Sequence, residues 1–176
     1  MKIELIREKD RTFPLLSNPD AITFLKVWHC SYESLRRIQD FHSLETLVIA
    51  SYPDNDFTPL SMLKRLKVLQ IIHMPEVDDL SPLSELSSLY TLSLQTLPSW
   101  DSSGKKTIVK SLRPLANLKT LRHMELFGVV PESRSLSEIT DMTFLETASF
   151  SKYAKKEIAD FFSATGVRRD WNPPIK

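Results

Sequence analysis

Four histidines and one cysteine are the residues with which this chain could hold a metal ion. Zinc sites usually draw such ligands from short motifs on one element. No His-x-His, His-Glu-x-x-His or Cys-x-x-Cys spacing occurs among them. We therefore predict no metal site. The residues in question are His29, Cys30, His42, His73 and His123.

Catalysis without a metal would need a nucleophile or an acid paired with a base, and the sequence offers few of these groups. Cys30 is the sole thiol, and Asp78 and Asp79 are neighbouring carboxylates in a connecting loop. The two aspartates are better explained as a solvated turn than as an acid/base pair. The chain has 3 glycines and lacks the Gly-x-Gly-x-x-Gly and Gly-x-x-x-x-Gly-Lys phosphate motifs. We expect no catalytic residue, no cofactor and no enzymatic activity.

Composition excludes further classes of function. The 23 basic and 22 acidic residues leave a net charge of +1, without the basic excess that nucleic acid demands. No apolar run approaches the roughly 18 residues that span a bilayer, and the first ten residues lack a signal-peptide core. A single cysteine excludes an internal disulfide framework and fits a reducing compartment. We expect a soluble cytoplasmic protein, unless a leader has been removed, that binds neither membrane nor nucleic acid.

The elements that carry these residues follow from a repeat. Two apolar residues separated by one position occur seven times, with second members at 5, 27, 49, 71, 94, 126 and 150. The steps between them are 22, 22, 22, 23, 32 and 24 residues. Alternation with a period of two is what a short strand requires. The pairs are Ile3/Leu5, Leu25/Val27, Leu47/Ile49, Leu69/Ile71, Leu92/Leu94, Met124/Leu126 and Ala148/Phe150.

Ahead of each pair, apolar residues recur at every third position. This spacing suits a tight turn, either α or 3₁₀, on the outside of a coil. A bundle of amphipathic helices would instead show a drifting spacing of three and four over long helices. Because the spacing resets with each unit, it favours a solenoid of stacked coils. One column of the repeat contains Phe13, Leu35, Phe57, Leu80, Leu112 and Leu136.

The unit resembles a known family. Residues 80–94, Leu-Ser-Pro-Leu-Ser-Glu-Leu-Ser-Ser-Leu-Tyr-Thr-Leu-Ser-Leu, look like the leucine-rich repeat. The short 22-residue form is similar to that of internalins and of the phosphatase-regulator subclass, and Pro59, Pro82 and Pro114 match the proline that opens the convex turn there. Over roughly residues 1–150, the resemblance implies an α/β solenoid of about seven coils. It would have a parallel concave sheet and short convex helices or turns.

The chain departs from the family at the position three after each strand pair. Family members usually place there an asparagine that bonds the backbone of adjacent coils, so those backbone groups need other partners here. The family buries this position, so we expect Cys30 to be an inert core residue. His29 and His73 share a column but lie two strands apart, about 10 Å, which is too far to share one zinc ion. The column contains Glu8, Cys30, Tyr52, Met74, Leu97, Val129 and Tyr153.

Two stretches break the repeat. We expect the solenoid to cover residues 1–152, with an exposed insertion loop at about 97–110, and a capping helix and tail to cover 153–176. Trp100 in the insertion is either a contact residue or a cover for the edge of the core. The helix, which should stop at Gly166, is expected to shield the last coil, and a partner-binding helix is the alternative. Trp171 is expected to pack on the cap.

The concave sheet is the expected binding surface. Residues flanking each buried pair point away from the core and would be polar if the face were only solvated. Several are instead large and apolar on neighbouring strands, which is typical of a protein-binding site, and tryptophan is enriched at binding hot spots. With a polar fringe and the insertion, the predicted partner-binding residues are Phe24, Trp28, His29, Val48, Val68, Gln70, Ile72, His73, Trp100 and Phe127.

The favoured function is a non-catalytic module that recognises another protein through this face and scaffolds or inhibits it. In one alternative, the patch is covered by the N-terminal segment or is buried in a homodimer that makes the chain a self-associating structural unit. In another, the chain is the substrate-recognition arm of an enzyme such as a ubiquitin ligase, which would need a catalytic domain for which we see no room after the cap.

Overall fold

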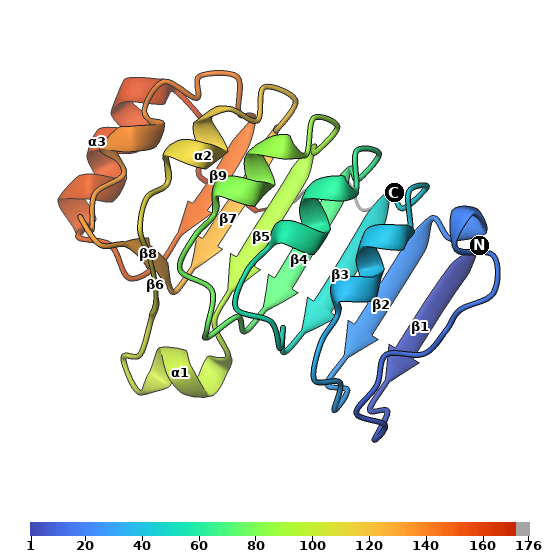
Figure 1. Ribbon diagram of the computed structural model, residues 1–176. Helices are drawn as coiled ribbons and strands as arrows, with labels where there is room; N and C mark the ends of the chain where they lie inside the picture. Colours follow the sequence, from blue (N-terminus) through green and yellow to red (C-terminus); the bar gives the residue numbers. More distant parts are fainter. Residues whose placement is uncertain (172–176) are drawn as a thin grey trace.

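The computed structural model describes residues 1–171, which form a curved sheet with short helices along its outer side (Figure 1). The sheet has 7 strands, in the order β1-β2-β3-β4-β5-β7-β9, and every neighbouring pair is parallel. The predicted α/β leucine-rich-repeat solenoid is therefore confirmed. The strands are β1 (Lys2–Ile6), β2 (Phe24–Trp28), β3 (Thr46–Ala50), β4 (Val68–Ile72), β5 (Thr91–Gln95), β7 (His123–Phe127) and β9 (Thr147–Phe150).

Residues predicted to share a column lie side by side across the sheet. On the concave side, Lys26 lies opposite Val48. On the inner side, Leu47, Leu69 and Leu92 are paired in register and have an exposed fraction of 0%. The repeat thus stacks identical apolar positions into one continuous core along the solenoid.

The convex side is built from short helices, mostly of the 3₁₀ type. In such a helix each N–H bonds the carbonyl three residues back: Leu60 N donates to Phe57 O at 2.9 Å, and Leu63 N donates to Leu60 O at 3.0 Å. An apolar residue at every third position therefore faces the core in each turn. The helices are η1 (Pro19–Ala21), η2 (Arg36–Asp40), η3 (Thr58–Met62), η4 (Ser81–Glu85), η5 (Ser137–Ile139) and one α-helical turn, α2 (Arg113–Ala116).

The insertion between β5 and α2 is more ordered than the exposed loop that we expected at residues 97–110. It begins with α1 (Pro98–Ser102), which stands beyond the ends of the main strands in Figure 1. It continues into β6 (Thr107–Val109), which pairs in parallel with β8 (Val129–Pro131). The apolar residues directly after β7 give the insertion a strand to pair with, and Val109 is fully buried as a result.

The helix α3 (Lys155–Thr165) lies beyond β9 and covers the last coil (Figure 1). Its buried Phe161 packs edge-on against Phe150 of β9, with ring centroids 4.9 Å apart. It ends at Gly166, whose left-handed backbone (φ 69°) lets its N–H bond Phe162 O at 3.0 Å. Residues 172–176 of the expected tail lie outside the described residues.

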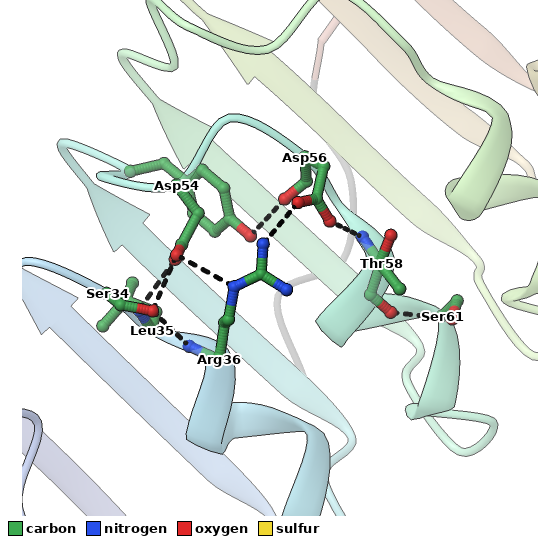
Figure 2. Close-up of polar contacts among 8 residues, drawn as sticks. Ser34, Leu35, Arg36, Asp54, Asp56, Thr58 and Ser61 are labelled. Carbon is green, nitrogen blue, oxygen red and sulfur yellow. Dashed lines mark hydrogen bonds and ion pairs between the residues drawn. The ribbon is translucent and has the colours of Figure 1, made fainter.

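Carboxylates from the following coil bond the start of the convex turns. Asp54, between β3 and η3, accepts hydrogen bonds from Ser34 Oγ and from Leu35 N, both at 2.7 Å (Figure 2). The Arg36 guanidinium lies between this carboxylate and Asp56, with Nε 3.8 Å from Asp54 Oδ1 and Nη2 2.8 Å from Asp56 Oδ2. The backbone at the start of η2 is thus joined to the next coil.

The same bridge occurs twice more towards the C-terminal end of the solenoid. Glu138 accepts hydrogen bonds from Ser111 Oγ at 2.8 Å and Leu112 N at 2.7 Å. Burial raises the pKa of Glu138, but the hydrogen bonds from Ser111 and the backbone outweigh it and leave the pKa below its usual value. Glu157 of α3 bonds Ser135 Oγ and Leu136 N in the same way. These carboxylates tie adjacent coils together in a chain that lacks the asparagine column.

Two residues of that column also bond backbone carbonyls of the preceding coil. Tyr153 donates its hydroxyl to Val129 O at 2.8 Å, and burial raises the pKa of this hydroxyl. Cys30 is half-buried rather than fully buried, and its Sγ donates to Leu5 O at 3.4 Å. We infer that Cys30 is a weak donor at the edge of the core.

A side chain at Gly128, directly after β7, is predicted to destabilise the fold. The φ of Gly128 is +71°, and a Cβ would lie 2.3 Å from Thr96 Oγ1. Gly128→Ala should lower the free energy of unfolding by about 1–2 kcal/mol from left-handed strain, and further from that contact. Urea denaturation measures the loss. Gly104→Ala is the matched control, because Gly104 has φ +76° and nothing within 4 Å. Equal losses in the two variants would show that Thr96 simply moves aside.

Candidate protein-binding face

A hollow of about 500 Å³ lies on the concave side of the sheet, and we call it the concave hollow. Five of the predicted partner-binding residues line it together: Phe24, Trp28, Val48, Val68 and Gln70. All five are half-buried, at alternate positions of β2, β3 and β4. The alternation of the strands therefore presents apolar and aromatic side chains to this side while the leucines fill the core.

Lysine side chains hold the two aromatic rings of β2. Lys2 Nζ lies 4.6 Å from the centroid of Phe24, and Lys26 Nζ lies 4.6 Å from the centroid of Trp28. Glu4 balances part of this charge through an ion pair of 2.7 Å with Lys2, whose hydrogen bond lowers the pKa of the glutamate. These cation–π contacts favour the present orientation of the two rings. Lys2, Glu4 and Lys26 are not among the partner-binding residues predicted from the sequence.

A second group of predicted residues lies at the carboxyl ends of β2 and β4, outside the lining of the hollow. His73 packs edge-on against Trp100 of α1, with ring centroids 4.9 Å apart. Burial lowers the pKa of His73, so its ring favours the neutral form. His29 is exposed and packs against Trp28, with centroids 5.5 Å apart, and Ile72 is half-buried at the end of β4. Trp100 thus contacts a residue predicted to lie in the polar fringe.

The β5 and β7 side of the face is polar and internally bonded. Ser93 Oγ donates to Glu125 Oε2 at 2.7 Å, and Gln95 Nε2 donates to the same oxygen at 2.6 Å. Ser93 and Glu125 are buried although they point away from the core. Phe127 lies opposite Gln95 in the register and does not line the concave hollow.

Trp171 is the residue of the site that sequence reasoning misplaced. We expected its ring on the cap, but it lines the concave hollow together with residues of β1 to β5. The chain reaches this place through Arg168, whose backbone pairs with Thr147 as a further rung beside β9. No periodic pattern marks Trp171, because the segment after α3 belongs to no coil of the repeat.

Two of the histidines considered for chemistry contact hydroxyl groups rather than one another. His29 Nδ1 is 3.4 Å from Ser51 Oγ, and His123 Nδ1 is 2.8 Å from Thr147 Oγ1. Over residues 1–171, no group of three or more His, Cys, Asp or Glu residues is placed to hold a metal ion. No helix in this described part of the chain is long and apolar enough to cross a bilayer.

No protein-family model matches the sequence, and no curated protein matches it either. Solved structures do match. An internalin of Listeria monocytogenes (inlF) aligns with a TM-score of 0.60 at 18% identity, over 92% of this chain and 45% of its own. Internalin C2 (inlC2) of the same strain aligns with a TM-score of 0.53 at 23% identity, over 86% of this chain and 71% of its own.

These likenesses are to leucine-rich-repeat proteins, and the parallel sheet of repeated strands agrees with them. The fold of this chain is a leucine-rich-repeat solenoid. The chain spans less than half of the length of the first internalin, and at these identities the likeness extends to the fold alone.

Proposed function

We propose that the chain is a non-catalytic protein-interaction module that recognises a protein partner through its concave face, as a scaffold or an inhibitor. The observation that carries the proposal is the concave hollow, whose lining on a solvent-facing sheet includes the half-buried side chains of Phe24, Trp28 and Val68. Apolar patches of this kind mark sites that another macromolecule covers. Large aromatic side chains at their centre supply most of the binding free energy in protein interfaces.

The character of the hollow favours a protein over a nucleic acid. The lysines beside it are engaged with Phe24, Trp28 and Glu4, so they form no row of free charges for phosphates. The overall charge of +1 points the same way. The single cysteine supports a partner met in a reducing compartment such as the cytoplasm.

We also propose that the chain belongs to the short-repeat group of leucine-rich-repeat proteins. Strand partners in β1 to β4 are offset by 22 residues, as in Lys2 opposite Phe24 and Phe24 opposite Thr46. Prolines open η3, η4 and α2. Both features support membership of the short-repeat group that includes the internalins and phosphatase regulators, in which binding through the sheet face would be the expected mode.

Trp28→Ala tests the proposal. Affinity capture with the full chain from its native host identifies the partner, and titration calorimetry then compares the variant with the wild type. We expect binding to weaken by at least about 2 kcal/mol, or about 30-fold, because a large central side chain is lost. The melting temperature should stay nearly unchanged, since Trp28 lies outside the core.

Leu15→Ala is the control, because Leu15 is 85% exposed and lies away from the hollow. It should leave the affinity unchanged. A large fall in the melting temperature of Trp28→Ala would assign the ring to the core. An unaltered affinity would move the site elsewhere, in the first place to Trp100. Light scattering of the purified chain should give a monomer, and a dimer dissociated by Trp28→Ala would support the self-associating alternative instead.

A further inference from the structure

The segment after α3 crosses part of the face that the partner would cover. Arg168 N donates to Glu146 O at 3.2 Å, and Ala148 N donates to Arg168 O at 3.0 Å, so the segment starts beside β9. The Arg169 guanidinium lies 5.9 Å from the ring centroid of Phe162. Two residues later, Trp171 lines the concave hollow. Residues 167–171 thus run from the edge of the sheet back towards its middle.

Burial on the concave side follows this path. Thr91, Ser93, His123 and Thr147 point away from the core on β5, β7 and β9, yet each is at most 4% exposed. The equivalent positions on β2 and β4, such as Phe24 and Val68, are only half-buried. The concave positions beside which the segment starts are therefore more buried than those of the concave hollow, which Trp171 alone of the described segment lines.

The attachment of the segment is weak beyond its start. Over residues 1–171, no hydrogen bond ties Asp170 or Trp171 to the rest of the chain. Thr91 Oγ1 and His123 Nε2 are buried without a hydrogen-bond partner among the described residues. Covering such atoms is unfavourable, and uncovering them lets water bond them. Among the described residues, Trp171 is thus held by its apolar contact with the hollow and by no hydrogen bond, and we expect that the segment can be displaced.

We propose that residues 167–171, the strap, mask the concave hollow in the free protein, with Trp171 competing for it against an apolar side chain of the partner. This inference rests on the proposed function, because the hollow must be the partner site for the strap to regulate it. A tethered competitor acts at a high effective concentration, in the millimolar range for a short link, so even a weak contact masks the site. The partner binds in full only after the strap is released.

A peptide carrying residues 167–171, labelled with fluorescein, tests the strap without a known partner. Fluorescence anisotropy measures its binding to the full chain and to the full chain with Trp171→Ala. We expect the variant to bind the peptide at least about tenfold more tightly, because its own segment no longer competes. Trp171→Phe should fall between the two, since a phenyl ring retains part of the contact. A peptide with alanine in place of its tryptophan should not bind.

Equal affinity of the wild type and Trp171→Ala would overturn the proposal, as would the absence of peptide binding to Trp171→Ala at millimolar concentration. Circular dichroism verifies that the variant is folded. Adding Trp28→Ala to Trp171→Ala should abolish peptide binding, and retained binding would place the peptide outside the hollow and also contradict the strap. If the peptide experiments contradict the strap while Trp28→Ala still weakens partner binding, the proposed function is retained without the strap. If the peptide binds as expected but the partner ignores Trp28→Ala, the proposed function fails instead.

Discussion

Replacing Leu69 by alanine is expected to lower the free energy of unfolding by about 2–5 kcal/mol, as for other core truncations that leave a cavity. Leu69 has an exposed fraction of 0% and stands between Leu47 and Leu92 in the register. Each coil of a solenoid is stabilised mainly by its two neighbours, so a cavity at this position loosens the packing on both sides. Urea denaturation followed by circular dichroism measures the loss.

Gln70→Ala is the matched control in the same strand. Gln70 lies on the concave side and is half-buried, and its side chain has no hydrogen bond within the described residues. Its removal should change the free energy of unfolding by less than about 0.5 kcal/mol. Similar losses in the two variants would contradict the assignment of the core and concave sides.

The strands could be predicted because the same pattern of apolar residues occurs seven times along the chain. The centres Lys26, Val48 and Gln70, expected from the spacing of apolar pairs, are the middle residues of β2, β3 and β4. The three-residue spacing likewise favours tight convex turns, and Leu60 and Leu63 lie in them as expected. Periodic features of the fold could therefore be read from the sequence.

Features that occur once could not be read in the same way. The insertion contains the short alternating stretch Thr107–Val109, whose partner β8 follows the next main strand, and a polar composition concealed this pairing. Trp171 lies outside the periodic pattern, and its place over β1 to β5 depends on the path of the chain after Gly166. Local spacing contains no information on such a path.

The candidate site was predictable to the same extent. The alternation of β2 to β4 places Phe24, Trp28 and Val68 on one side, and the structure brings them together in the concave hollow. Phe127 and His29 do not line the hollow. The position of a residue in the repeat determines its side of the sheet, but not which other residues lie near it there. Whether these residues bind a partner stays a prediction.

The chain lacks the asparagine column, so the sequence did not show which groups would bond the backbone between adjacent coils. In the structure, carboxylates form such bonds. Sequence reasoning anticipated that the backbone would need other partners but not which ones, since Asp54, Glu138 and Glu157 lie 19 to 26 residues from the amides that they accept from. The shared feature is a Ser-Leu pair at the start of each turn, as in Ser34-Leu35. A serine hydroxyl and a backbone N–H side by side form a donor pair that suits one carboxylate.

Asp54→Ala is expected to lower the free energy of unfolding by about 2–3 kcal/mol. The side chain of Asp54 is 6% exposed, and its loss leaves Leu35 N buried without its acceptor. An orphaned buried amide costs about 1–3 kcal/mol, and hydrogen bonds to a charged group are stronger than those between neutral groups. Arg36 would also lose one of its two carboxylates, although this contact adds little because it is 3.8 Å long and Arg36 is 58% exposed. Urea denaturation measures the loss, and hydrogen exchange should show faster exchange at Leu35 N.

Asp40→Ala removes the same charge at an exposed position of η2, where the side chain has no hydrogen bond or ion pair within the described chain. It should change the stability by less than about 0.5 kcal/mol. Asp54→Asn separates geometry from charge, because an amide keeps one acceptor oxygen but turns an NH₂ group towards a donor, so we expect an intermediate loss. If Asp54→Ala were as stable as Asp40→Ala, the bridge between the second and third coils would contribute nothing. The curvature of the solenoid would then depend on leucine packing alone.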